Sequence, residues 1–185
     1  MTAQAFAVFD SPIGPCGIAW NGRGIVGFHL PGATEARTRA RLSQRFADAA
    51  EAPPPPGVQR VIDRVLALLA GEAVDLSDVP IVLDGVPDFH RRVYDVARAI
   101  PPGRTMTYGE IARRLGAPHD SREVGQALGR NPIAVIVPCH RVLGADGRMG
   151  GFSAPGGVAT KRRILEIEGA AALGAGPLFA APPAR

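Results

Sequence analysis

Four consecutive prolines at positions 53–56 limit how this 185-residue sequence can fold. A helix interior or a central strand cannot pass through them, because proline lacks a backbone N–H and fixes φ. We expect a stiff spacer there. Glycine and proline at residues 85–87 mark a second break, which divides the chain into an N-terminal unit, residues 1–86, and a C-terminal unit, residues 87–169. Residues 170–185, rich in Ala, Gly and Pro, are expected to form a flexible tail.

The N-terminal unit has the pattern of a small α/β domain. Residues 5–10 predict a strand, and residues 16–20 and 24–30 predict a β-hairpin around Asn21-Gly22, a pair that favours tight turns. Residues 34–51 predict a largely exposed, arginine-rich helix. Apolar residues at 58, 61, 62, 65, 66 and 69 have the spacing of one helical face. Residues 79–85 predict another short strand.

The C-terminal unit predicts mainly helices. Apolar residues at 89, 93, 96, 97 and 100 share one helical face, and Pro-Pro-Gly at 101–103 ends that helix. Thr107 and Glu110 have capping-box spacing, so a helix should begin at Tyr108 and end at Gly116. A second short helix should start at residue 120 or 121 and run to about residue 130, before Asn-Pro. Two such helices form a helix-turn-helix pattern, which also occurs in ordinary helix packing.

Beyond these helices, residues 133–138 (IAVIVP) predict a buried strand. After a loop, a last helix should reach Glu168, with Lys161, Arg162 and Arg163 on its exposed side. The net charge of +4 is a mild bias towards polyanions. Neither a signal peptide nor a membrane span is apparent, and two distant cysteines argue against a disulfide scaffold. We therefore expect a cytoplasmic protein with free thiols.

Cys139 is the residue whose setting suggests chemistry. A lone cysteine is most often a small buried hydrophobe. Here, a proline ends the apolar run, His140 and Arg141 follow at once, and the glycine-rich residues 144–152 would let a ligand approach the backbone. A nearby imidazole would lower the pKa of the thiol and make it a nucleophile. Contact with His140 would need a turn or a bridging water, and Glu168 is a candidate to orient the imidazole.

Other kinds of site fit this pattern less well. A thiol protease would need a histidine from elsewhere, and those at positions 29, 90 and 119 have no recognisable setting. Adjacent Cys and His give poor metal-ligand spacing. GADGRMGG does not follow the first strand of a βαβ unit, which argues against a dinucleotide site. A nucleophile beside a helix-turn-helix suggests instead a module that presents DNA to a thiol.

The segment PCHRV, preceded by Asn-Pro at 131–132 and followed by GxxGGFS at 147–153, closely resembles the O6-alkylguanine-DNA alkyltransferases. SPIGPCGIAW and GIVGFHL also look like the N-terminal domain of that family. The resemblance implies an α+β fold, with a small ribonuclease H-like N-terminal α/β domain and a mainly helical, winged helix-turn-helix-like C-terminal domain. It also implies DNA repair by direct, irreversible transfer of an alkyl group from O6 of guanine, or from O4-alkylthymine, to the thiolate of Cys139. Each molecule would act once.

The same resemblance implies roles in handling DNA. The damaged nucleotide must leave the stack to reach a buried thiol. Arg122 would fill the vacated space, and Tyr108 would crowd the backbone phosphate and donate to the departing guanine. Gly125 and Ala127 would let the second helix of the pair enter the minor groove.

Further implied roles concern the reaction itself. Glu168, His140 and a water would form a relay to Cys139, and Asn131 would be a hinge. In the substrate pocket, Val142 would offer its carbonyl to the guanine amine, with Ser153 close to O6. Phe152 departs from the tyrosine of some members.

The resemblance also bears on partners and alternatives. It implies double-stranded DNA containing O6-alkylguanine as partner, no cofactor, no obligate protein partner and a monomer. Some members bind zinc in the N-terminal domain, but with only Cys16 in this half we expect no such site. A non-catalytic lesion binder and a cysteine hydrolase remain as alternatives, and the intact PCHRV disfavours the first.

Overall fold

The N-terminal unit is built on a four-stranded sheet. In a computed structural model that describes residues 2–170, strands β1 (Ala5–Phe9), β2 (Cys16–Asn21), β3 (Gly24–His29) and β4 (Ala50–Glu51) are ordered β3-β2-β1-β4. The three long strands pair antiparallel, and β4 lies parallel to β1. The β2–β3 hairpin turns at Asn21, whose side chain accepts from the Arg23 N–H, as the Asn-Gly pair predicts.

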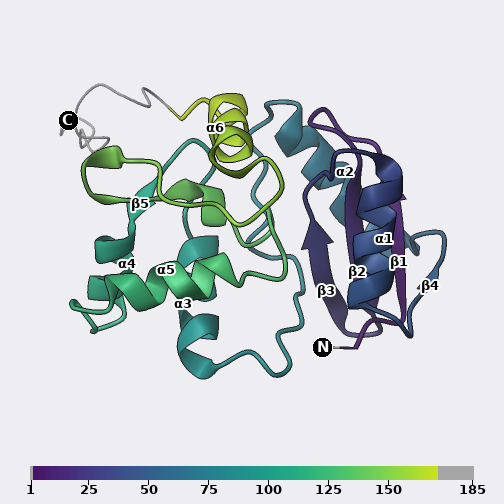
Figure 1. Cartoon of the computed structure of the whole chain (residues 1–185), viewed down its shortest axis with the longest axis horizontal. Coiled ribbons are helices and arrows are strands. Elements are labelled where there is room, and N and C mark those ends of the chain that lie inside the picture. The colour runs from purple at the N-terminus through teal and green to yellow at the C-terminus, as the bar shows by residue number, and fades with distance from the viewer. Residues whose placement is uncertain (1, 171–185) are drawn as a thin grey trace.

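Two helices complete this unit (Figure 1). Helix α1 (Glu35–Arg45) packs on the sheet through Leu42, and it ends earlier than the expected residue 51, because the following residues turn back to pair as β4. Helix α2 (Pro56–Leu69) begins inside the proline run, with Pro56 in its first turn, where no N–H is needed. Its buried residues follow the predicted helical face. The strand expected at residues 79–85 is wrong: only one bridge, between Ile25 and Ile81, forms there.

The C-terminal unit is mainly helical, as expected. Helices α3 (Asp88–Arg98), α4 (Tyr108–Arg114) and α5 (Ser121–Gly129) precede a short 3-10 turn, Cys139–Arg141. Strands β5 (Met106–Thr107) and β6 (Val142–Leu143) form a two-stranded parallel sheet, and helix α6 (Gly157–Ile167) follows. The predicted capping box at the start of α4 is confirmed, since Thr107 and Glu110 exchange hydrogen bonds.

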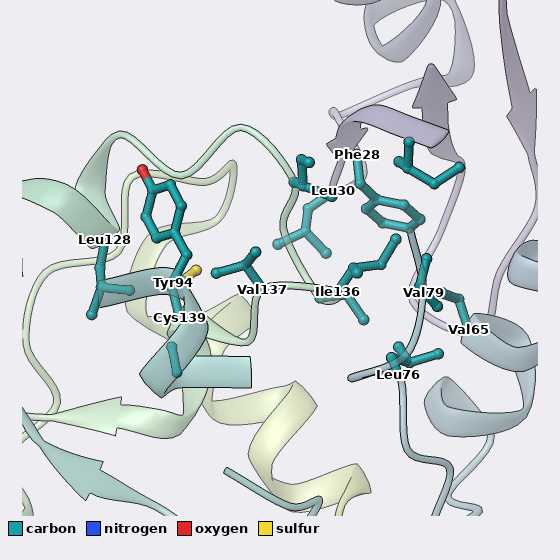
Figure 2. Packing of buried hydrophobic residues seen from close by; sticks show 14 of the residues in the cluster. Phe28, Leu30, Val65, Leu76, Val79, Tyr94, Leu128, Ile136, Val137 and Cys139 are labelled. Atoms are coloured by element: carbon teal, nitrogen blue, oxygen red, sulfur yellow. The ribbon is translucent and has the colours of Figure 1, made fainter. Parts of the chain in front are cut away.

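One continuous core joins the two units. Figure 2 shows Phe28 of the N-terminal unit beside Ile136, with Val137 between Ile136 and Cys139. The fold is therefore α+β, with the β3 edge of the sheet facing the helical half (Figure 1). The boundary at 86/87 stays a prediction. Residues 171–185, most of the expected tail, lie outside the described residues. Among residues 2–170, no helix has both the length and the apolar character needed to cross a bilayer.

Candidate active site

The turn that leads into Cys139 is shaped by Asn131. Its amide nitrogen donates to the Val137 carbonyl at 2.8 Å, and its oxygen accepts from the Ile133 N–H at 2.9 Å. Val135 adopts φ +69°, a conformation that is rare for a β-branched residue and concentrates at functional sites. The strand predicted at residues 133–138 is therefore wrong. The segment is mostly buried, but it folds back on itself, and the Asn131 side chain holds this turn.

The sulfur of Cys139 lies at the base of an open groove. The residue is 9% exposed and lines a cavity of about 360 Å³ together with Phe152 and Ser153. The Asn131 amide nitrogen is 3.4 Å from the sulfur. Burial raises the pKa of the Cys139 thiol, against the opposing effects of the Asn131 hydrogen bond and the charge of Lys161. The expectation of a lowered thiol pKa is thus wrong for the free protein, and the thiol keeps its proton.

His140 is held in place by the buried ion pair between Glu168 and Arg141. Its Nε2 lies 2.9 Å from Glu168 Oε1, and the Glu168 side chain is fully buried. Arg141 donates to both oxygens of that carboxylate and, through Nη1, to the Ile100 carbonyl. The other imidazole nitrogen, Nδ1, is buried without a partner among the described residues. Burial lowers the pKa of His140, so the neutral ring has an Nδ1 that can accept a proton.

Lys161 is the residue that the sequence reading placed wrongly. We expected it on the exposed side of α6, but it is 0% exposed, and its ammonium donates to the Val142 carbonyl at 2.5 Å. The ammonium also lies 5.9 Å from the centre of the Tyr108 ring. Burial lowers the pKa of Lys161 to about 8, although the nearby Cys139 opposes this. The signal was present, because residues 161, 164, 165 and 168 share one helical face.

Tyr108 begins α4 and is half-buried between two glycines. A Cβ at Gly150 would lie 2.7 Å from its hydroxyl, and one at Gly125 of α5 would lie 3.9 Å from its ring. Burial raises the pKa of Tyr108, and a negative charge on Cys139 would raise it further. The hydroxyl is thus kept as a proton donor close to the thiol.

Helices α4 and α5 present a basic outer face. Arg113 and Arg114 in the last turn of α4 are exposed, and so is Arg122 at the start of α5. Ala127 is instead buried in the core, where its carbonyl accepts from the Tyr94 hydroxyl. The structure therefore brings Arg122, but not Ala127, to the outer face, and Gly125 faces α4.

The remaining predicted pocket residues have partners of their own. The Val142 carbonyl, expected to face a guanine amine, accepts from Lys161, and the Ser153 hydroxyl donates to the Gly129 carbonyl at 2.8 Å across the groove. Phe152 is half-buried. Among the described residues, none of the three other histidines forms a hydrogen bond with Cys139. His90 Nε2 instead lies 3.5 Å from Glu123 Oε1. Within residues 2–170, no three His, Cys, Asp or Glu side chains cluster as metal ligands.

Comparisons with known proteins agree on one group. The family described as "6-O-methylguanine DNA methyltransferase, DNA binding domain" matches residues 88–170. A methylated-DNA–protein-cysteine methyltransferase of Mycobacterium tuberculosis is 39% identical over 88% of this chain and 91% of its own. One of Methanosarcina acetivorans is 36% identical over 89% and 97%. Among solved structures, M. tuberculosis OGT in complex with DNA is 38% identical with a TM-score of 0.70, covering 89% of this chain and 92% of that chain.

Proposed function

This chain belongs to the methylated-DNA–protein-cysteine methyltransferase family, and from that premise we propose that Cys139 is its alkyl acceptor. The activity is DNA repair by transfer of an alkyl group to a cysteine of the protein. Of the two cysteines, Cys16 is 0% exposed in the core of the N-terminal unit, where burial raises its pKa to about 11. Cys139 lines a cavity of about 360 Å³. That opening is the observation that carries the assignment.

The reaction is an in-line substitution at the alkyl carbon of O6-alkylguanine. The Cys139 thiol gives its proton to His140 Nδ1, through a bridging water. A sulfur lone pair then forms the C–S bond while the C–O6 bond breaks. The electron pair of the C–O6 bond stays on O6 of the guanine. Tyr108 donates its proton to the departing base and becomes a phenolate, and the proton held on His140 then returns to Tyr108 through water, so that overall the thiol proton is passed to the guanine. The products are an S-alkylcysteine and guanine, so the acceptor is consumed and no external donor is needed.

The buried groups behind the thiol make this proton transfer possible. Glu168 fixes the Nε2–H tautomer of His140 and stabilises the imidazolium that forms, as a carboxylate does in a nucleophile–base–acid triad. Arg141 keeps that carboxylate ionised and oriented. Asn131 and Lys161 favour the sulfur anion as it develops. In the free protein Cys139 is thus a neutral thiol, and it loses its proton only as it attacks the alkyl group.

DNA would dock on the α4–α5 pair. The exposed arginines there contact phosphates, and Arg122 takes the place of the extruded nucleotide in a helix-turn-helix that enters the minor groove of double-stranded DNA. The adjoining β5–β6 sheet supports a winged description of this unit, and the order β3-β2-β1-β4 supports a ribonuclease H-like one for the N-terminal unit. Monomeric state and cytoplasmic location stay predictions.

Mass spectrometry of the intact protein tests the assignment. Incubation with DNA containing O6-methylguanine should add one methyl group, on the peptide with Cys139, and Cys139→Ala should bind the DNA without gaining mass. Methylation of that variant would disprove the role of Cys139. Turnover without an adduct would indicate a hydrolase.

Arg122→Ala tests the flipping role separately. It should slow transfer from duplex DNA more than transfer from free O6-benzylguanine. Equal losses on the two substrates would count against it.

A further inference from the structure

The groove at Cys139 continues well beyond the space that a methyl group needs. It is lined by Cys139 and Phe152 and also by Phe28 and Leu30 of the N-terminal unit, and it has a volume of about 360 Å³. Figure 2 shows Leu30 and Phe28 on the side of Val137 away from Tyr94. Both units therefore build its walls, although only the C-terminal one carries the reactive thiol.

Three arginines line this groove. Arg41 and Arg45 are one turn apart on α1, and Arg130 caps the C-terminal end of α5. Among the described residues that line it, none is Asp or Glu, and no carboxylate of residues 2–170 forms an ion pair with any of the three. The lining of the groove thus carries positive charge without an internal counter-charge.

The pKa shifts of Tyr94 and His29 reflect the positive charge of these arginines. Burial raises the pKa of Tyr94 to about 12, and the charges of Arg130 and Arg45 oppose this rise, so both lie near the tyrosine that packs beside Cys139. His29 lines the groove too, and burial together with Arg45 and Arg41 lowers its pKa to about 4. The histidine is therefore neutral at pH 7, and the positive charge comes from the arginines.

The geometry of substitution directs the alkyl group into this space. During in-line displacement the carbon lies between the sulfur and O6, so any larger substituent on that carbon must project sideways. Behind the sulfur, Val137 and His140 are packed with 0% and 1% exposure. The groove that Cys139 lines is open space next to this packed side.

We propose that this groove selects O6-alkylguanines whose alkyl group ends in a negative charge, such as a carboxylate, which Arg41, Arg45 and Arg130 would bind. The inference rests on the proposed function, because it concerns the alkyl group that Cys139 receives. It gives the N-terminal unit a part in substrate selection beyond support of the fold.

Free-base substrates test this without interference from DNA phosphates. Second-order rates of protein alkylation would be measured by mass spectrometry with O6-benzylguanine, O6-(4-carboxybenzyl)guanine and O6-(4-aminomethylbenzyl)guanine. We expect the wild-type protein to prefer the carboxylate over the ammonium substrate by roughly tenfold in low salt, and less in high salt, because exposed charges are screened. Equal rates for the two charged substrates would overturn the proposal.

Substitutions locate the preference on the arginines. In the double variant Arg41→Gln/Arg45→Gln, and more weakly in Arg130→Gln, the ratio of the carboxylate rate to the ammonium rate should fall towards one. Arg60→Gln, which removes an exposed charge on α2 outside the groove, should keep the wild-type ratio. An unchanged ratio in both groove variants would refute the assignment. Absence of an adduct from DNA containing O6-methylguanine, tested beside these bases, would instead overturn the proposed function itself.

Discussion

Glu168→Gln should show that the buried carboxylate behind His140 stabilises the fold as an anion. Burial alone would raise the pKa of Glu168, but the hydrogen bonds and charges of His140 and Arg141 lower it from 4.5 to about 2. By linkage, such a depression corresponds to about 3 kcal/mol of stability at neutral pH. The variant also leaves the buried Arg141 charge without its counter-ion, for which a cost of about 3–5 kcal/mol is typical.

The pH dependence distinguishes this ion pair from simple packing. A carboxylate with a depressed pKa stabilises the folded state above its unfolded pKa, and this contribution is lost as pH falls from 4.5 towards 2. The free energy of unfolding should therefore be about 3 kcal/mol lower in Glu168→Gln than in the wild-type protein at pH 7, and the difference should shrink between pH 5 and pH 3.

Urea unfolding at pH 7, 5, 4 and 3, followed by far-UV circular dichroism, measures this difference. Glu166→Gln is the matched control, because Glu166 is exposed on the same helix and makes no ion pair with another described residue. It should follow the wild-type protein at every pH. A gap between Glu168→Gln and the wild-type protein that stays constant from pH 7 to pH 3 would refute the reasoning, since it would not depend on ionisation.

Three further substitutions test the groups around the thiol. Lys161→Met should remove a contribution of about 3 kcal/mol that grows between pH 8 and 10.5, because only the unfolded state holds the lysine proton in that range, and urea unfolding should show it as a wild-type-minus-variant difference that rises with pH. Gly150→Ala should displace the Tyr108 hydroxyl and slow methyl transfer roughly tenfold or more, whereas Gly151→Ala, with open space at its Cβ, should not. Asn131→Ala should cost about 2 kcal/mol in unfolding and shift iodoacetamide alkylation of Cys139 to higher pH; an unshifted profile would contradict its contact with the sulfur.

Local chemistry made much of the fold predictable. The capping box at Thr107 and the Asn21-Gly22 turn depend on residues a few positions apart, so the sequence contains all of their interactions. The strand predicted at residues 133–138 failed because its apolar composition reports burial and not conformation. The side chain of Asn131, which precedes this segment, pairs with the Ile133 N–H and the Val137 carbonyl, which a neighbouring strand would otherwise have bonded. Likewise, the helix expected to reach residue 51 ends at Arg45, because β1 offers a partner to Ala50 and Glu51.

The sequence predicted that Asn131, His140 and Glu168 belong with Cys139, and their roles in the reaction stay predictions; the electrostatics around the thiol were not predicted. The adjacency of Cys139 and His140 suggested a lowered thiol pKa, yet burial is the larger effect and raises it. The cation that opposes the effect of burial comes from elsewhere in the chain: it is Lys161, whose ammonium is held by the Val142 carbonyl. For an acceptor that is consumed once, this balance has a use. Reaction with oxidants follows thiolate character and exposure, so a protonated sulfur at the base of a groove is protected until an alkylated base brings the carbon that it attacks.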